Sequence, residues 1–534
     1  MIESGDWVSP RLNGVLYFEK PPLFYWAQAV SLKVGGVTEA ATRFWPAAFA
    51  LIGCILTYWI GRVLFDTRTA YFASLVLGTS LLYFAISQIV ILDMAVSVLI
   101  TGALYVFLAI SRESNKRRKR VLSHVFFVLL ALATLTKGLI GLVIPGAVIF
   151  LWVLLLNNWK SLRPLCSWSG IVVFLAVAAP WHFLAWNANS EFAWYYFVHE
   201  HFLRYLTEGH GRVQPFWFFF ALLPLCLFPW TGYLYFAITD PLRGGLRQIK
   251  NRPNEVYLII WAGFVLLFFS ASGSKLIPYI LPAMPPLALL IGRQISLAFT
   301  SKRETVIKAG ASTFVGIAAL LAVSIPWVVV TRADKVTEHA MTWAILASVI
   351  LTTGAIAVYL PWPTRSPQRL VFIPCITMAA FCLVINPLGS SVRNNSTKAL
   401  ALTLKKLPLS SEQVYSLLDY HQDLAPYLGM EVSVAACEPE EQRYGYSIEE
   451  SPANWLGKEA FLENWSNPLP QFAVVKMSDA ERFAVTNPGW NAHLIQKSNR
   501  YVLVGNNSGM LLLKQEGLET LLKGEENIHL TSRL

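Results

Sequence analysis

The stretch Tyr17-Phe18-Glu19-Lys20-Pro21-Pro22 stands just before the apolar part of the chain begins, and the rest of the sequence is organised around it. Proline fixes its own φ angle and favours an extended conformation in the residue before it, so Glu19 and Lys20 are predicted to lie on a rigid loop. Such a loop at the mouth of a helical bundle is either an anchor at the membrane surface or part of a site. The remaining residues have to distinguish the two interpretations.

The composition is that of a membrane protein. Of the 534 residues, 55% are hydrophobic and 14% are charged, and the mean hydropathy is +0.49; a soluble chain carries about 25% charged residues. The formal net charge of +11 does not indicate nucleic-acid binding, because membrane proteins concentrate Lys and Arg in cytoplasmic loops. The six cysteines form no Cys-x-x-Cys pair, so neither a zinc–thiolate site nor a disulfide framework is predicted.

Long apolar runs predict a mainly α, polytopic membrane protein. A membrane-spanning helix needs about 20 apolar residues, and twelve segments meet this requirement. The predicted spans lie near residues 38–62, 70–90, 91–111, 122–136, 139–157, 168–187, 216–237, 255–273, 278–298, 307–331, 341–361 and 369–387.

The loops between these spans alternate in charge. The strongest basic run is Lys116–Arg120, and it falls on the same side as four other basic loops, which contain Lys160, Arg163, Arg243, Arg247, Lys250, Arg252, Lys302, Arg303, Arg365 and Arg369. The positive-inside rule makes this side cytoplasmic. The opposite side then holds residues 1–37, the hairpin at Lys137, loop 188–215, the Ser274-Lys275 loop and everything after about residue 388.

The polar residues after 388 predict a second domain. Residues 1–387 are predicted to form the membrane domain of about twelve helices, and residues 388–534 a small extracytoplasmic α/β domain. Short strands are expected at 414–418, 431–435 and 472–475, with helices near 396–406 and 478–485. The last twenty or so residues read as a loosely specified tail.

Two carboxylates stand out near the membrane. Asp93 follows Ile89-Val-Ile-Leu at the external start of the third span, and a carboxylate in such an apolar setting is expensive and commonly functional. A structural role also fits Asp93, because the macrodipole favours a carboxylate at a helix N-terminus. For Glu19 and Lys20 the alternative is an ion pair whose lysine reaches the lipid headgroups.

Loop 188–215 carries the densest group of polar residues, with His199, Glu200, His201 and Arg204 in one short segment. If residues 195–206 are helical, Glu200 and Arg204 lie on one face. Imidazole is a common ligand of divalent transition metals, so this loop could supply a metal site together with Glu19. A hydrogen-bonded interfacial helix is the alternative.

Lys275 and Tyr279 lie in Ser272-Gly-Ser-Lys-Leu-Ile-Pro-Tyr279, before a span with further prolines. Such a helix start is tolerated where it lines a cavity. The charge-derived topology places these residues at the same membrane face as Glu19, Lys20, Asp93, Lys137, His199, His201 and Arg204. Four cations (Lys20, Lys137, Arg204 and Lys275) can neutralise a phosphate, and a carboxylate can take a proton from an alcohol. A phosphate held at the bilayer surface indicates a lipid-linked donor.

The same residues carry a family resemblance. The pattern Ser4-Gly-Asp-Trp7…Pro10…Gly14…Tyr17-Phe-Glu-Lys-Pro-Pro-Leu-Phe-Tyr25-Trp26 resembles the first external loop of the ArnT-like (aminoarabinose transferase) family, one of the polyprenyl-phosphate-sugar glycosyltransferases related to protein O-mannosyltransferases. Further family motifs follow in order: Leu92-Asp93, Leu135-Thr-Lys-Gly138, Glu200-His201…Arg204-Tyr205, Pro215-Phe-Trp217 and Ser274-Lys275…Pro278-Tyr279…Leu281-Pro282. The resemblance covers the whole membrane part and is only general over the tail.

The resemblance implies a GT-C membrane fold of thirteen helices with a periplasmic α/β domain. It implies transfer of a sugar from undecaprenyl phosphate to an acceptor at the outer face of the bacterial inner membrane. By this analogy Glu19 and His199 or His201 hold a divalent metal, with zinc the expected ion. Lys20, Arg204 and Tyr279 hold the lipid phosphate, with Lys137 and Lys275 in the same donor-binding set, and Asp93 sits at the reaction centre.

The family pattern has a transmembrane helix and an Asp-Glu pair before the Ser-Gly-Asp-Trp motif, and the first Asp of that pair is its expected catalytic carboxylate. This chain starts at Met1, inside that loop. The expectation is a misplaced start codon or a truncated gene, with little or no activity from the chain as given.

Three interpretations therefore stand: a lipid-linked-sugar glycosyltransferase, a transporter or flippase that binds the same lipid, and a catalytically inactive relative. The sequence leaves the sugar open, and the acceptor can be lipid A, another glycolipid, a polysaccharide or a protein.

Overall fold

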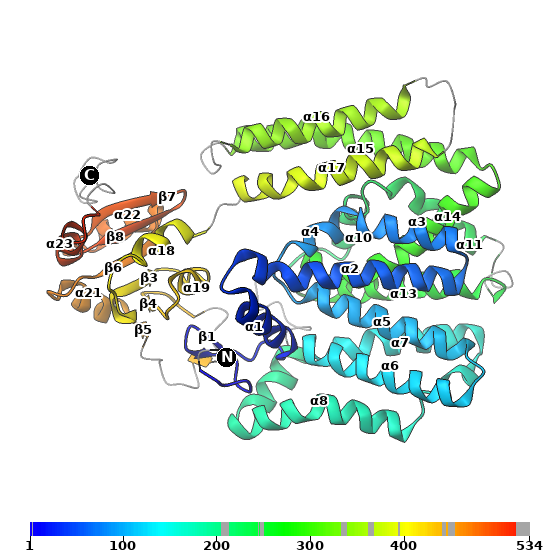
Figure 1. Ribbon diagram of the computed structural model, residues 1–534, viewed down its shortest axis with the longest axis horizontal. Helices are drawn as coiled ribbons and strands as arrows, with labels where there is room; N and C mark the ends of the chain where they lie inside the picture. The colour runs from blue at the N-terminus through cyan, green and yellow to red at the C-terminus, as the bar shows by residue number, and fades with distance from the viewer. Residues whose placement is uncertain are drawn as a thin grey trace. The chain divides into compact units, whose positions relative to one another are not determined.

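Helices dominate the first part of the chain and a mixed sheet follows in the last part (Figure 1). The computed structural model describes the whole chain except residues 3, 204–212, 244, 246–249, 333–338, 361–367, 393–395, 440–444, 447–453 and 519–534. It divides into a helical unit (residues 1–8, 19–327 and 342–387) and a sheet unit (residues 9–18, 328–341 and 388–534). The sheet unit therefore contains a short N-terminal segment that the sequence had placed in the membrane domain.

Nine helices of the described residues are long and apolar enough to cross a membrane. They are α2 (Glu39–Leu64), α5 (Asp93–Arg112), α6 (Lys116–Lys137), α8 (Trp168–Ala188), α13 (Pro253–Ala271), η4 with α14 (Ile277–Thr300), α15 (Glu304–Thr331), α16 (Ala340–Tyr359) and α17 (Arg369–Val392). The prediction of a mainly helical, multi-pass membrane protein is confirmed.

Two further spans are bent. Helices α3 (Thr67–Gly78) and α4 (Leu81–Ser87) meet at 61°, and α10 (Phe218–Cys226) meets the segment Thr231–Leu242, which comprises η3 (Thr231–Tyr233) and α11 (Leu234–Leu242), at 115°. Counting each pair as one span gives eleven, against the twelve predicted.

The one predicted span left over, 139–157, corresponds to α7 (Ile140–Leu156), which has 17 residues. Its length of about 26 Å is less than the thickness of a typical hydrocarbon core. The remaining helix of the helical unit's N-terminal part, α1 (Leu23–Gly35), has only 13 residues.

The two bends pack against each other. The backbone N–H of Leu81 donates to the carbonyl of Phe228 at 3.0 Å, and the indole Nε1 of buried Trp230 donates to Thr79 Oγ1 at 2.9 Å. These bonds satisfy polar groups that the interrupted helices would otherwise leave unpaired in an apolar surrounding.

Helix α5 is one of the two most buried spans of the unit. In its most apolar window 83% of the residues are buried, compared with 89% in Ile277–Thr300, 22% in α8 and 17% in α15. Aromatic rings pack around the C-terminal part of α5. The ring centroid of Phe107 lies 5.8 Å from that of Trp152, which lies 5.7 Å from that of Tyr257. Because α5 begins at Asp93, the burial of this helix fixes where that carboxylate lies.

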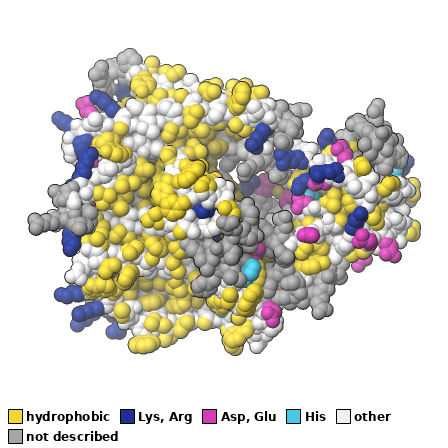
Figure 2. All heavy atoms as spheres, turned by 180° about the vertical axis from the view of Figure 1, so that it is seen from behind, with side chains coloured by type: hydrophobic (Ala, Val, Ile, Leu, Met, Phe, Trp, Pro, Cys, Tyr) yellow, Lys and Arg dark blue, Asp and Glu magenta, His cyan; other side chains and the backbone are white. Residues whose placement is uncertain are grey.

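Basic side chains gather at one end of the helical unit, beyond a broad hydrophobic band (Figure 2). At this end Arg112 Nη2 donates to Asn254 Oδ1 at 2.8 Å, and Asn254 Nδ2 donates to the carbonyl of Leu64 at 2.6 Å. Helices α2 and α5 therefore end where α13 begins. We call this the basic end, and Asp93, at the other terminus of the 20-residue helix α5, marks the opposite end. Assignment of the basic end to the cytoplasm stays a prediction.

The sheet unit has six strands in the order β5-β4-β3-β6-β8-β7. The sequence predicted β3 (Val414–Leu417), β4 (Ser433–Ala435) and β6 (Phe472–Lys476), and it missed β5 (Trp455–Leu456), β7 (His493–Ser498) and β8 (Tyr501–Gly505). Strands β3 to β6 pair in parallel, and β8 is antiparallel to both β6 and β7. The predicted small α/β region is confirmed as a mixed sheet.

Helices cover this sheet: α18 (Lys398–Leu404) and α22 (Met477–Thr486), which the sequence predicted, and α19 (Leu424–Leu428), α21 (Lys458–Ser466) and α23 (Asn507–Gln515), which it did not. A hairpin of β1 (Arg11–Leu12) and β2 (Val15–Leu16) belongs to the same unit. At its turn, Asn13 exchanges two hydrogen bonds with the backbone of Val432, at 2.8 and 2.9 Å. The predicted C-terminal tail lies mostly outside the described residues.

Candidate functional site

Asp93 and Lys137 form an ion pair at the end of the helical unit opposite the basic end. Lys137 Nζ lies 2.5 Å from Asp93 Oδ1, and the side chains are 12% and 13% exposed. Asp93 is the first residue of α5 and Lys137 the last residue of α6. The two helix macrodipoles therefore favour a carboxylate and an ammonium at these positions. Gly138, with φ of +72°, ends α6 just after the lysine.

Tyr279 lies against the same lysine. The centroid of its ring is 4.6 Å from Lys137 Nζ, a distance at which the ring face attracts a cation. The ring also lies 5.3 Å from that of Phe269. Tyr279 is part of η4 (Ile277–Ala283), a tight helix that carries prolines at 278 and 282. Three residues from separate parts of the sequence are thus brought together, as the topology predicted.

Lys275 has a different environment. Only 7% exposed, it donates to the carbonyls of Gln214 at 2.9 Å and Ser272 at 2.6 Å. A β-bridge between Val213 and Ser274 joins the same two segments. Two of the three ammonium donors thus hold these loops together. We therefore leave Lys275 out of the phosphate-binding set in which the sequence had placed it.

Glu19 and Lys20 lie on the loop before α1, as predicted. Lys20 Nζ donates to the backbone carbonyl of Glu19 at 2.6 Å and lies 3.8 Å from its Oε2. The side chains are 14% exposed for Glu19 and 22% for Lys20. This degree of burial favours a position within a site over a side chain extended to the lipid headgroups.

The histidine-rich segment of the predicted loop 188–215 forms a π-helix, η2 (Trp194–Leu203). In it the ring of His199 stacks on that of Tyr195, with centroids 5.0 Å apart. The side chain of His201 and the whole of Arg204 lie outside the described residues. Helix formation is therefore found over the described part of the predicted segment 195–206, and π-helical turns are frequent at functional sites.

The donors of the predicted metal site are only partly described, because the His201 side chain lies outside the described residues. Among the residues with described positions, no group of three or more His, Cys, Asp or Glu side chains lies close enough to hold a metal ion. Glu19 is near the ammonium of Lys20 and His199 is stacked on an aromatic ring. The metal site at Glu19 with His199 or His201 therefore stays a prediction, and we derive no chemical step through a metal.

Sequence reasoning missed one polar contact near Asp93. Asn386, in α17, donates through Nδ2 to Gln88 Oε1 at 3.2 Å. Gln88 lies five residues before Asp93, in the connection between α4 and α5. A single amide in an apolar run carries no motif, and only its uncommon position at the end of a predicted span could have drawn attention to it.

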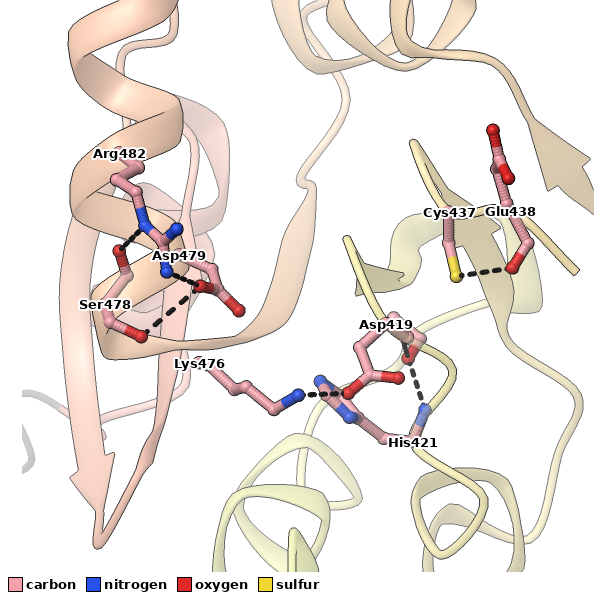
Figure 3. A network of polar contacts seen from close by, with 9 residues as sticks. Asp419, His421, Cys437, Glu438, Lys476, Ser478, Asp479 and Arg482 are labelled. Carbon is pink, nitrogen blue, oxygen red and sulfur yellow. Dashed lines mark hydrogen bonds and ion pairs between the residues drawn. The ribbon is translucent and has the colours of Figure 1, made fainter. Parts of the chain in front are cut away.

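The sheet unit holds a second ion pair, which the sequence did not single out (Figure 3). Lys476 Nζ lies 2.5 Å from Asp419 Oδ2. Beside it, Ser416 Oγ donates to the carbonyl of Asp419 at 2.6 Å and accepts from the backbone N–H of His421 at 2.8 Å. These residues lie at the carboxyl ends of the parallel neighbours β3 and β6. Burial lowers the pKa of the His421 imidazole.

Comparisons with known proteins point in one direction. The family model described as dolichyl-phosphate-mannose-protein mannosyltransferase matches residues 19–186, a segment that contains Glu19, Lys20, Asp93 and Lys137. An undecaprenyl phosphate-alpha-4-amino-4-deoxy-L-arabinose arabinosyl transferase of Pectobacterium carotovorum is 30% identical over 326 residues, covering 61% of this chain and 58% of the relative. One of the same description from Edwardsiella ictaluri is 31% identical over 372 residues, covering 67% and 64%.

The fold also has a match. The crystal structure of ArnT from Cupriavidus metallidurans bound to undecaprenyl phosphate superimposes with a TM-score of 0.81 at 24% identity, covering 96% of this chain and 92% of that one. This confirms the GT-C membrane fold with its small α/β region. The chain thus spans less than two thirds of the length of the Pectobacterium carotovorum and Edwardsiella ictaluri relatives.

Proposed function

Because this chain is a relative of the ArnT-like aminoarabinose transferases, we propose that it is a glycosyltransferase of the bacterial inner membrane. It transfers a sugar from undecaprenyl phosphate to an acceptor at the outer face. We further propose that the sugar is 4-amino-4-deoxy-L-arabinose, as in the names of the relatives. The proposed acceptor is the lipid A part of lipopolysaccharide; another glycan or a protein is the alternative that the assay below separates.

The Asp93–Lys137–Tyr279 cluster is the observation that carries this proposal. A cluster at helix ends, mostly shielded from solvent, places a carboxylate and an ammonium where a lipid headgroup would meet them. Departure of a phosphate requires stabilisation of its developing charge, and a fixed cation supplies it. Attack by a hydroxyl requires that its proton be accepted or oriented, which an ionised carboxylate does.

The roles follow from the contacts. Lys137 uses one of its three donors on Asp93, and the others are available to phosphate oxygens. Tyr279 holds the ammonium in place through its ring. Lys20 and Arg204 complete the proposed phosphate-binding set, and Asp93 is the carboxylate nearest to the reacting hydroxyl. A divalent metal at Glu19 with His199 or His201 is kept as a separate proposal, which metal analysis of the purified protein tests.

The transporter interpretation has one observation in its favour, since two bent helix pairs occur in the helical unit. Carriers use such broken helices to build a site near the bilayer midplane. Here, however, the buried pair lies at the first residue of one helix and the last residue of another. This position favours chemistry at the membrane surface.

The test combines donor binding with transfer. Native mass spectrometry of the purified protein measures the binding of undecaprenyl phosphate. Transfer is measured in membranes supplied with radiolabelled lipid-linked aminoarabinose, as label that appears in lipopolysaccharide, glycan or protein. We expect Asp93→Asn to bind the lipid and lose transfer, and Lys137→Met to lose both. Lys116→Met, a charge removed at the basic end, is the control that keeps both. Donor binding with no transfer by the unmodified chain would contradict the enzyme proposal and favour the flippase or the inactive relative.

A further inference from the structure

A second charged site lies at the basic end of the helical unit, well away from Asp93. It is a cavity of about 430 Å³ between α11, α13 and α14. Four arginines line it (Arg243, Arg252, Arg293 and Arg303), together with two carboxylates, Asp240 and Glu255. The lining therefore carries an excess of positive charge. Figure 2 shows that basic side chains gather along this end of the unit.

Asp240 organises three of the arginines. Arg303 Nη1 lies 2.6 Å from its Oδ2 and Arg243 Nη1 lies 3.3 Å from its Oδ1. Arg252 Nη1 donates to the backbone carbonyl of Asp240 at 2.7 Å. One carboxylate can neutralise only one cation, and each of these contacts uses one of the five N–H donors of a guanidinium. The three guanidinium groups thus converge with donors left over.

Arg293 approaches the cavity from α14. Its Nη1 lies 2.8 Å from Asp66 Oδ2, and its guanidinium lies 5.0 Å from the ring centroid of Phe65. Both contacts hold the guanidinium in one orientation. Within the part of the chain that the structure describes, its Nε is buried and has no hydrogen-bond partner. Asp66 lies outside the lining, and even when it is counted the arginines outnumber the carboxylates.

The neighbouring Gln294 gives an independent indication. It lines the same cavity and is only 4% exposed, yet its side-chain oxygen has no hydrogen-bond partner among the described residues. A buried polar group without a partner costs free energy, so something that fills the cavity should donate to this amide. Arginines that only held helix ends together would not require beside them a buried glutamine whose oxygen has no partner within the described part of the chain.

We propose that this cavity binds a phosphate ester that also carries a hydroxyl group. Arginine is the residue best suited to phosphate, because its planar donors match two phosphate oxygens at once. The hydroxyl would donate to Gln294. Basic pockets between membrane helices on the cytoplasmic side bind anionic phospholipid headgroups, and the phosphoglycerol headgroup of phosphatidylglycerol has both groups. A free phosphate shares the anionic part of this chemistry.

The experiment titrates the purified full chain with dihexanoyl phosphatidylglycerol, dihexanoyl phosphatidylcholine and inorganic phosphate, and follows the thermal unfolding temperature. We expect phosphatidylglycerol to raise this temperature and phosphatidylcholine not to. Arg252→Gln removes a guanidinium that, among the described residues, donates to the backbone carbonyl of Asp240 and to no side chain. It should shift the titration midpoint roughly tenfold, as expected for one charge-assisted hydrogen bond. Gln294→Leu, which replaces the side chain by one of similar size, should weaken the binding of phosphatidylglycerol and leave the binding of inorganic phosphate unchanged.

Arg117→Gln removes one charge from the first turn of α6, outside the cavity, and is the matched control, which should titrate like the unmodified chain. A different result is that inorganic phosphate stabilises the protein as much as phosphatidylglycerol does at the same concentrations. If Arg252→Gln then weakens this effect, the site is supported and its ligand is a soluble anion. The proposal fails if Arg117→Gln and Arg252→Gln shift the midpoint equally, because attraction would then come from general surface charge. It also fails if none of the three probes stabilises the protein.

Discussion

Two ion pairs in this chain have the same geometry and different surroundings. In each, a lysine ammonium lies 2.5 Å from an aspartate oxygen. The side chains of Asp93 and Lys137 in the helical unit are 13% and 12% exposed, whereas those of Asp419 and Lys476 in the sheet unit are 43% and 37% exposed. Because the distance is the same, the pairs differ mainly in their access to water, and the buried pair also has the Tyr279 ring beside its lysine.

Burial changes what each pair does. An exposed ion pair contributes little to stability, since water screens the charges and solvates both when they separate. A buried pair contributes little net stability either, but removal of one partner leaves an uncompensated charge in an apolar surrounding. Such a charge is also ready to bind an incoming ion of opposite sign. The comparison therefore favours the functional role proposed for the buried pair and a minor structural role for the exposed one.

The largest effect is expected from Lys137→Met, which leaves the Asp93 carboxylate without the cation that faces it. We expect a loss of about 3–5 kcal/mol of stability and loss of sugar transfer. The double variant Asp93→Asn with Lys137→Met should recover most of the stability, because no isolated charge remains, but no transfer. Thermal unfolding in detergent and the radiolabel assay measure the two effects. Recovery of transfer in the double variant would show that the pair is only structural.

A smaller effect is expected at Tyr279, whose ring faces the Lys137 ammonium at 4.6 Å. Tyr279→Leu removes the ring and should weaken undecaprenyl phosphate binding by about 0.5–2 kcal/mol, the range for a cation–π contact. Tyr279→Phe keeps the ring and removes the hydroxyl. If Tyr279→Phe binds the donor like the unmodified chain, the ring positions the lysine; if it is as weak as Tyr279→Leu, the hydroxyl contacts the phosphate directly.

The two units also differ in what sequence could predict. The helical unit was predictable because apolar runs and basic loops both respond to the membrane, and they agreed on the ends of α5 and α6. This agreement is why Asp93, Lys137 and Tyr279 could be placed together before the structure was known. The bends at Thr79 and Trp230 were not predicted, since Gly78-Thr79-Ser80 and Pro229-Trp230-Thr231-Gly232 only briefly interrupt runs that are long enough for one span. They depend on hydrogen bonds between the two breaks.

In the sheet unit, short strands with buried residues on both faces were found from their β-branched and aromatic content, as with β6. Strand β5 has only two residues, which is too short a segment to be found from the sequence. The Asp419–Lys476 pair was missed because its residues are 57 positions apart and meet only through parallel pairing of β3 with β6. Lys275 shows what a motif leaves out: the sequence could not show its bonds to the carbonyls of Gln214 and Ser272, through which it braces two loops.

A pH dependence is expected next to the exposed pair. Burial lowers the pKa of His421; Lys476 also lowers it, while Asp419, Asp423 and the hydrogen bond to the backbone of Val474 act in the opposite direction. The unfolded chain therefore takes up a proton below pH about 6.5 that the folded sheet unit resists. Stability of this unit is retained above that pH and falls as the pH decreases.

Hydrogen exchange of β6 amides in the full chain measures this effect. Protection should decrease from pH 7 to pH 5 after correction for the intrinsic exchange rate, by at most about 1.4 kcal/mol per pH unit for one proton. His421→Phe keeps a ring against Tyr501, whose centroid is 4.7 Å away, and removes the titration. A decrease of the same size in His421→Phe would assign the pH dependence to other groups.

The smallest effect is expected from Lys476→Met, the counterpart of Lys137→Met at the exposed pair. Its hydrogen bond to Asp419 raises the pKa of Lys476, so the pair's contribution is fully present below the ordinary lysine pKa and is lost only as the pH rises through the raised value. At neutral pH we expect a loss of about 0–1 kcal/mol, because water can solvate the Asp419 carboxylate that remains. Hydrogen exchange of β6 at pH 7 measures it. A loss as large as that of Lys137→Met would mean that access to water does not separate the two pairs, and the functional assignment of Asp93 and Lys137 would then rest on the transfer assay alone.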